Sequence, residues 1–332
     1  MKRVLLVALA TALLWPATAC VNRRTDADSI DTRIKQMPGV SSTDLDYKAS
    51  YESGQVFRLT VMLDREVTET QATAVGRTFI DQMNRKGMAG HKVDFRVRYP
   101  ASKRQKNVEL PQYSQALFEF GKTTPPTNPS ADDVSDSIKV WLATVRDSVT
   151  QSVYLSQPTW GGSADSRNIV VTLKPDATHA AARALQDANP GLADATWQLS
   201  IVAGDRDRPR TYATTPDPPT DAIKALWSQI NEVVDPSYEL TGVTRPMQDD
   251  DQAETKIEID IGPGANHENE ADTARIARAV AALLPRFGHP TALVVWGPVT
   301  SIELVVGGCY RHDSDHERQP LELELAKQYE RC

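Results

Sequence analysis

The feature that most constrains the fold of this chain is a short pattern that occurs three times. An aliphatic residue stands five positions before a Thr or Asn, and the pairs are Leu63 with Thr68, Leu173 with Thr178, and Ile261 with Asn266. Thr and Asn are favoured at helix N-caps because their side-chain oxygen accepts a free backbone N–H of the first turn. The pattern therefore predicts, at three places, a strand that ends in a tight turn and leads into a helix.

Apolar residues at spacings of three and four follow each cap and predict a helix with one buried side. These helices are expected at residues 69–85, 179–188 and 268–286. A second helix is expected upstream of each, around Ile34, Ile138 and Ile223. Two of the upstream helices open with near copies of one segment, in which Ser135 and Thr220 take the capping position.

Alternating apolar residues between each pair of helices predict a β-hairpin. The hairpin strands are expected at residues 45–50 and 56–63, 153–159 and 169–173, and 238–244 and 256–261. A further strand follows each second helix, at residues 93–99, 196–202 and 292–296, with added apolar runs at 116–120 and 301–306. We therefore predict an α+β protein of three tandem α-β-β-α-β units, each with two helices packed on a small, mostly antiparallel sheet.

Two proline-rich stretches, residues 111–129 and 209–219, suggest where the units end. The predicted division is a signal peptide at 1–19, an anchor linker at 20–26, unit one at 27–120, a linker at 121–132, unit two at 133–203, a linker at 204–218, and unit three at 219–332. The last unit is expected to end in a helix that a disulfide tethers.

The first twenty residues have the pattern of an export signal. Lys2 and Arg3 precede an apolar run at residues 4–14, and small residues lead into Cys20. The apolar run is shorter than the roughly 20 residues that span a bilayer. The segment resembles the bacterial lipoprotein signal, whose cysteine is diacylated and becomes the new N-terminus, so the resemblance implies a stable lipid anchor on Cys20. Ala17 stands where leucine is usual, so cleavage by ordinary signal peptidase and plain secretion is the alternative.

Charge and cysteine content narrow the possibilities further. The chain has a formal net charge of −7, which argues against a nucleic-acid-binding protein and against docking onto anionic lipid. It has three cysteines. If Cys20 carries lipid, Cys309 and Cys332 are left to pair in an oxidising compartment, where the bond would contribute about 3 kcal/mol.

One cluster of side chains suggests metal chemistry. Cys309 is followed by His312 and His316, which are zinc-ligand types. Cys309 is expected in the disulfide, however, and no second Cys/His pair completes a four-ligand set, so a polar loop is the favoured interpretation. No nucleophile elbow, P-loop or dinucleotide fingerprint occurs, and no cofactor is predicted. The six tryptophans could line a carbohydrate or lipid groove, but four of them fall on predicted helices or strands, so most are expected in the core: Trp141, Trp197, Trp227 and Trp296.

The element order of the first unit carries a second resemblance. From Ile34, through the helix after Thr68, to the strand at 93–99, the order α-β-β-α-β resembles the bacterial BON domain, a module of exported and envelope-associated proteins. The resemblance implies binding to membranes or envelope partners without catalysis. We therefore predict a non-enzymatic, lipid-anchored binding or structural protein on the extracytoplasmic face of the cell membrane, with an envelope protein or cell-wall component as partner. The alternatives are an extracytoplasmic hydrolase with its site between units, and a carrier of lipid or a small molecule.

Overall fold

The computed structural model describes residues 23–50, 54–100, 113–121, 128–158, 167–201, 210–247, 252–262, 267–310 and 318–332. The first elements along the chain are α1 (Arg24–Lys35), β1 (Val40–Ser50), β2 (Gly54–Leu63), α2 (Glu69–Arg85), β3 (Lys92–Pro100), β4 (Tyr113–Phe120), α3 (Ala131–Arg146), β5 (Thr150–Pro158) and β6 (Asn168–Leu173). The remaining elements are α4 (His179–Ala188), β7 (Thr196–Ile201), β8 (Arg210–Thr214), α5 (Asp221–Val233), β9 (Glu239–Thr244), β10 (Thr255–Asp260), α6 (His267–Leu283), β11 (Thr291–Trp296), β12 (Ser301–Val306) and α7 (Pro320–Tyr329). Short 3₁₀ turns follow α4 and α6, at Pro190–Leu192 and Leu284–Phe287.

The described strands form one mixed sheet of twelve strands, which follow one another in sequence order from β1 to β12. The prediction of three units, each with two helices on its own small and mostly antiparallel sheet, is therefore wrong. Strand β8, which falls in the predicted linker at 204–218, pairs antiparallel with β7 and parallel with β9. An unpaired edge strand exposes backbone N–H and C=O groups, and this pairing satisfies them across the predicted boundary.

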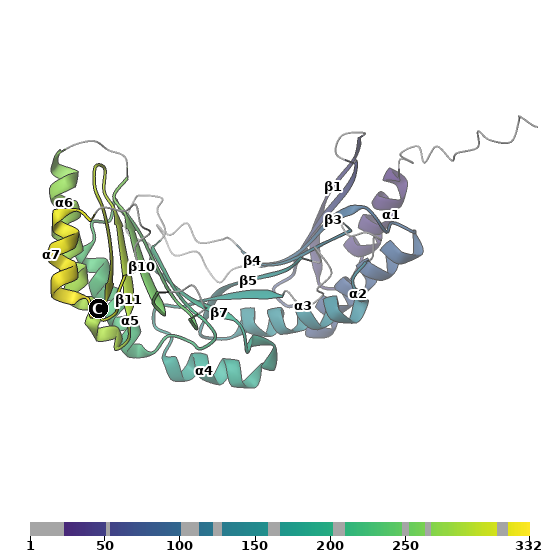
Figure 1. Cartoon of the computed structure of the whole chain (residues 1–332). Helices are drawn as coiled ribbons and strands as arrows, with labels where there is room; N and C mark the ends of the chain where they lie inside the picture. Colours follow the sequence, from purple (N-terminus) through teal and green to yellow (C-terminus); the bar gives the residue numbers. More distant parts are fainter. Residues whose placement is uncertain are drawn as a thin grey trace, which may run out of the picture. The chain divides into compact units, whose positions relative to one another are not determined.

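Two compact units make up the chain. One comprises residues 1–97, 117–135 and 158–166, and the other comprises residues 98–116, 136–157 and 167–332. The first contains α1, α2 and the strands β1 and β2, and the second contains everything from β6 onward (Figure 1).

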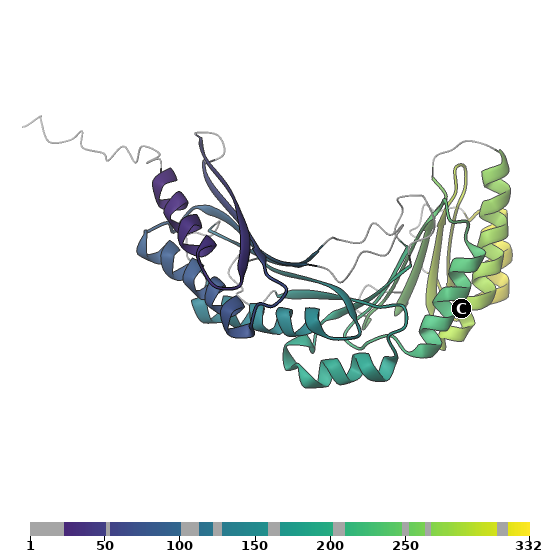
Figure 2. The ribbon, with the colours of Figure 1, turned by 180° about the vertical axis from the view of Figure 1, so that it is seen from behind.

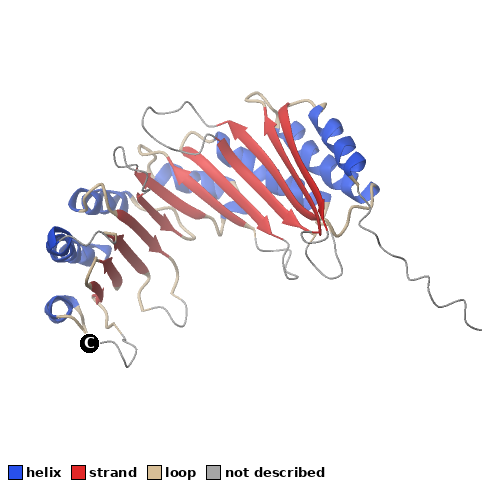
Figure 3. Ribbon diagram, turned by 90° about the horizontal axis from the view of Figure 1, so that it is seen from above, coloured by secondary structure: helices blue, strands red, loops and turns tan. Residues whose placement is uncertain are grey.

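Helices lie on one face of the strands in each unit, as the two opposite views in Figures 1 and 2 show. In the second unit the parallel pairs β6–β7, β8–β9 and β10–β11 are joined through α4, α5 and α6. Parallel neighbours need such crossovers, and right-handed crossovers that always step in the same direction place their helices on the same face. The other face, with no described helix over it, is seen in Figure 3. We call it the bare face.

Most of the predicted helix starts are confirmed. Thr68 caps α2 in a capping box with Gln71, and Thr178 caps α4 by accepting the Ala181 N–H at 3.2 Å. The third cap, Asn266, lies outside the described residues. Thr220 caps α5 as expected. Ser135 does not cap α3: that helix begins at Ala131, and the Ser135 hydroxyl donates to the carbonyl of Ala131 at 2.6 Å.

The core of each unit lies between the helices and the strands. In the first unit the Phe79 ring of α2 stacks on Phe95 of β3, with centroids 4.0 Å apart, and Phe57 of β2 lies 5.6 Å from Phe79. In the second unit three tryptophans are fully buried, as predicted: Trp141, Trp197 and Trp227. Aromatic side chains supply large apolar area, so these rings account for much of the burial that stabilises each unit.

The C-terminal segment is fixed along the outer edge of β12. Cys309 and Cys332 form the predicted disulfide, with their Cα atoms 4.8 Å apart. Close to this bond, the Gly307 N–H donates to the Tyr329 carbonyl at 2.9 Å, and the Val305 N–H donates to the Glu330 carboxylate at 3.2 Å. The end of the chain therefore takes hydrogen-bonding groups that β12 presents beyond its pairing with β11.

Candidate functional site

The residues predicted as sites are only partly within the described chain. Cys20, His312 and His316 lie outside the described residues, so their roles stay predictions. Cys309 and Cys332 form a disulfide, so neither offers a free thiol as a metal ligand. The search for a site therefore turns to the polar side chains that the strands and helices bring together.

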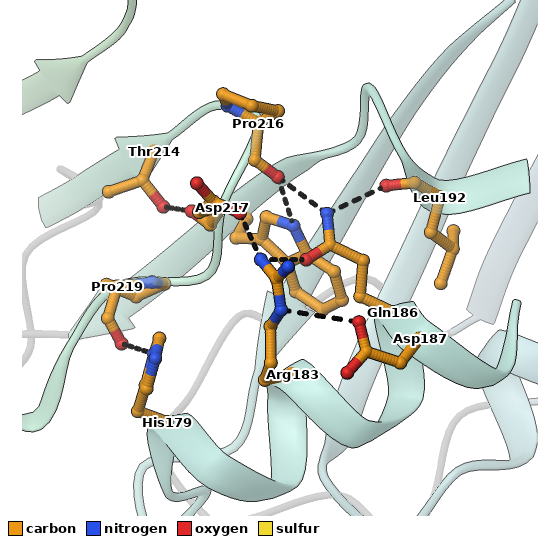
Figure 4. Close-up of polar contacts among 10 residues, drawn as sticks. His179, Arg183, Gln186, Asp187, Leu192, Thr214, Pro216, Asp217 and Pro219 are labelled. Carbon is orange, nitrogen blue, oxygen red and sulfur yellow. Dashed lines mark hydrogen bonds and ion pairs between the residues drawn. The ribbon is translucent and has the colours of Figure 1, made fainter. Parts of the chain in front are cut away.

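A polar network surrounds α4, and Figure 4 shows its members. Gln186 uses both ends of its amide: Nε2 donates to the carbonyls of Leu192 at 3.3 Å and Pro216 at 2.9 Å, and Oε1 accepts from Arg183 at 3.2 Å. The indole N–H of Trp197 also donates to the Pro216 carbonyl, at 3.0 Å.

The same network holds the proline-rich segment that follows β8. The Thr214 hydroxyl donates to the Asp217 carbonyl at 2.6 Å, and Arg183 pairs with the Asp217 carboxylate. The Nδ1 atom of His179 lies 3.3 Å from the Pro219 carbonyl. The partners are mostly backbone carbonyls of the protein itself, so we interpret this network as a structural brace for the turn between β8 and α5.

A second polar cluster lines a groove at the surface of the second unit. On the bare face, strands β9, β10 and β11 form a groove of about 530 Å³. It is lined by Glu239, Thr241, Glu258, Asp260 and Trp296. We call it the acidic groove. Its volume lies within the roughly 300–1,000 Å³ that is usual for small-ligand sites.

Strand register explains why these side chains meet. Asp260 of β10 lies opposite Glu239 of β9 on one side and opposite Trp296 of β11 on the other. Glu258, two residues earlier on β10, lies opposite Thr241. Alternate residues of a strand point to the same face, so Glu258 and Asp260 are about 7 Å apart along the strand. The intervening Ile257 and Ile259 point to the helices and are fully buried.

The pairing of Glu239 with Asp260 is unfavourable for folding. Side chains directly opposite on antiparallel strands approach to about 5 Å between Cβ atoms, and like charges there are destabilising. The bare face of the first unit shows the opposite arrangement. There Arg58 of β2 pairs with Asp46 of β1 at 3.2 Å and with Asp94 of β3 at 2.9 Å. The acidic groove therefore departs from the charge pairing that the other unit follows.

Hydrogen bonds fix the orientation of Trp296 and Glu258. The Trp296 indole N–H donates to Glu258 Oε1 at 2.7 Å, and the Lys256 ammonium pairs with Glu258 Oε2 at 3.1 Å. Partial burial acts to raise the pKa of Glu258, but these two donors outweigh it and hold the pKa below its ordinary value. Glu258 is therefore an anion at neutral pH, and Trp296 keeps its ring partly in solvent, with 41% of the residue exposed.

The sequence contained part of the signal for this groove. Glu258 and Asp260 alternate with isoleucines, which places both carboxylates on the solvent side of a strand. Most of the four tryptophans on predicted elements are expected in the core, and Trp296 is the one of the four that is exposed. Its neighbour Val295 is the fully buried residue that points to the helices, so the alternation of the strand turns Trp296 to the bare face.

Within the described ranges, no group of three His, Cys, Asp or Glu residues is arranged to hold a metal ion. None of the helices placed there combines the length and the apolar character of a membrane span. Comparison with known proteins found no protein-family model, no curated protein and no solved structure that matches this chain.

Proposed function

We propose that this chain is an exported lipoprotein, anchored at the extracytoplasmic face of the cell membrane through Cys20, and that it acts as a non-catalytic binding module. The anchor rests on the sequence: Lys2 and Arg3, the apolar run and the small residues before Cys20. Two acyl chains on one cysteine give stable membrane attachment, where a single chain is marginal.

The observation that carries the binding role is the acidic groove on the bare face. A sheet face that no helix covers normally carries polar side chains that pair with one another, as Arg58 and Asp94 do. The acidic groove instead holds opposed carboxylates and an exposed tryptophan. Exposed aromatic residues beside unpaired charge are typical of interaction sites, and local departures from stable pairing are expected where function requires them.

A hydrolytic role has less support from the groove. General acid catalysis by a carboxyl group needs a pKa raised toward neutrality, because the group must hold a proton at the working pH. The pKa of Glu258 is lowered by the Trp296 indole and the Lys256 ammonium, despite partial burial. The charge of this residue is thus suited to holding a ligand and unsuited to donating a proton.

Site-specific photocrosslinking in cells tests the binding role. A photoreactive amino acid at Thr241, inside the groove, is expected to give a discrete crosslinked product. The same probe at Ser228, an exposed residue of α5 on the helical side, serves as the matched control and should give none. Equal products at both positions, or none at Thr241, would refute a binding role for the groove.

The anchor has a separate test. Replacement of Cys20 by Ser is expected to move the protein from the membrane fraction to the soluble exported fraction, because no thiol remains for acylation. The matched control is Cys332→Ser, which removes a different cysteine and should leave the protein in the membrane fraction. Continued membrane partition of the Cys20→Ser protein would refute the anchor.

A further inference from the structure

We infer that the ligand of the acidic groove is a basic polypeptide segment, whose Arg or Lys side chains enter between Glu239, Asp260 and the ring of Trp296. This inference rests on the proposed binding role and names the partner of the same site. The partner is identified by the hydrogen-bonding groups, the charge and the aromatic surface that the groove offers.

The hydrogen-bonding groups of the groove are dominated by acceptors. Its one indole N–H is used by Glu258, and the nearby Lys256 ammonium pairs with the same carboxylate. Asp260 Oδ1 accepts the Gly262 N–H at 2.7 Å, which leaves its second oxygen for a ligand. Among the described lining residues, the Thr241 hydroxyl is the group that can both donate and accept. A ligand that fits must therefore bring donors.

The negative charge of the groove favours cationic ligands among those that are rich in hydrogen-bond donors. Three carboxylates and the adjacent Lys256 give the site a formal charge of about −2. A guanidinium group carries five N–H donors and no acceptor, and an ammonium group carries three donors. Either would neutralise Glu239 and Asp260, which lie opposite each other on β9 and β10.

The ring of Trp296 offers a second contact for the bound cation, beside the carboxylates. Trp296 lies opposite Asp260 in the register of β10 and β11, so a cation held by Asp260 lies beside its ring. Cations are attracted to the face of an aromatic ring, most strongly to tryptophan. The hydrogen bond to Glu258 fixes the indole, so little ordering is needed when the ligand arrives.

A neutral carbohydrate is the other ligand that uses a tryptophan and carboxylates. Sugar hydroxyls both donate and accept, so a sugar site benefits from protein donors as well as acceptors. The Trp296 indole and the Lys256 ammonium are already bound to Glu258, which leaves the Thr241 hydroxyl as a donor for a sugar. The opposed carboxylates also stay unneutralised under a neutral ligand, so the charge of the groove favours the basic segment.

Titration calorimetry with the full exported chain tests the inference, with a hexa-arginine peptide as the probe. Binding is expected at low salt, and it should weaken steeply between about 0.05 and 0.5 M NaCl because exposed charges are screened. Glu239→Gln and Asp260→Asn are each expected to weaken binding about tenfold, and Trp296→Leu about fivefold. Asp44→Asn removes the same charge from the exposed side of β1 and should change binding less than twofold.

Three outcomes decide against the inference. They are no binding of hexa-arginine, equal losses in the Asp44→Asn and Asp260→Asn proteins, or binding of cellohexaose in place of the peptide. If the Thr241 photoprobe gives its crosslink while hexa-arginine fails to bind, the basic ligand is refuted and the binding role stands. If both fail, the groove has no binding role. The neutralising variants remove repulsion, so loss of folding is not expected to obscure the result.

Discussion

Glu239 and Asp260 lie directly opposite each other on adjacent antiparallel strands, on the face of the sheet that no described helix covers. Like charges directly opposite each other on antiparallel strands are destabilising. The repulsion lowers the stability of the fold, and any ligand that neutralises it restores part of that stability. Folding stability and ligand binding are therefore linked at this pair, and both can be measured.

Neutralising one member of the pair is expected to stabilise the protein. Glu239→Gln should raise the free energy of unfolding by about 0.2–1 kcal/mol at low ionic strength, because it removes a like-charge cross-strand contact. Urea unfolding followed by circular dichroism measures this change. The control Asp44→Asn should have little effect, since Asp44 faces the neutral Thr60. A lower stability for Glu239→Gln than for the unchanged protein would contradict the repulsion.

Arg210 is a fully buried cation at the end of a helix, and its loss is expected to be severe. Its guanidinium donates to the carbonyls of Asn231 and Val234, each at 3.0 Å, where α5 ends. Helix C-termini leave unpaired carbonyls that a cation stabilises. Arg210→Met should reduce the free energy of unfolding by about 3 kcal/mol, because several buried carbonyls lose their donor.

Thermal unfolding of the Arg210→Met protein gives the readout. Arg275→Met is the matched control: Arg275 pairs with Asp272 at 2.7 Å on the surface of α6. Exposed pairs of this kind contribute at most about 1 kcal/mol, so its midpoint should move much less. Equal shifts for the two variants would show that the Arg210 contacts contribute little.

Protonation of His91 is expected to reduce the stability of the folded protein in mild acid. Burial lowers the pKa of His91 below 6.5, and nearby Arg23 adds to this, while the Met88 carbonyl and Asp26 act in the opposite direction. The unfolded chain therefore binds the proton more readily than the folded one. Stability is full above the unfolded pKa near 6.5 and is lost as pH falls through the folded pKa.

The variant His91→Asn tests this assignment, because its amide can still donate toward Met88 but does not titrate. Its stability should vary less than that of the unchanged protein between about pH 7 and pH 5. Urea midpoints at several pH values provide the measurement. Parallel pH profiles for the two proteins would assign the acid sensitivity to another group.

Reduction of the disulfide is expected to loosen the C-terminal segment without unfolding the sheet. Breaking the Cys309–Cys332 bond should cost about 3 kcal/mol, mainly by freeing the intervening loop in the unfolded chain. Amide hydrogen exchange should speed up at Val305 and Gly307, whose partners are Glu330 and Tyr329. The Ile257 amide, inside the paired strand β10, serves as the internal control and should speed up only by the factor that the global loss of stability sets.

Local pattern was enough to predict the helices and most strands. Thr68, Thr178 and Thr220 each mark the start of a helix, because the side-chain oxygen caps its first turn. The hairpin strands are recognisable from apolar and polar residues that alternate within a few positions. Local sequence does not indicate that strands of different predicted units pair with one another. Strand β8 has only five residues and lies between Pro209 and Pro216, so its composition indicates a linker.

The acidic groove depends on information that the sequence holds only in part. Residues 292–296 are continuously apolar, so no alternation tells which of them face the helices, and the position of Trp296 on a predicted strand does not say which face it takes. Glu239, Asp260 and Trp296 are also far apart along the chain. Only the register of three paired strands brings them together, and register follows from packing between distant segments.

The segment that runs along the outer edge of β12 affects whether one molecule can pair its sheet with that of another. A sheet built by adding strands in sequence order has a last strand whose outer groups could recruit a strand from another molecule. Tyr329, Glu330 and Arg331 take up the groups of Val305, Gly307 and Gly308 instead. The Cys309–Cys332 bond adds a covalent tie beside these hydrogen bonds, so reduction of the two cysteines is expected to leave that edge more open to aggregation.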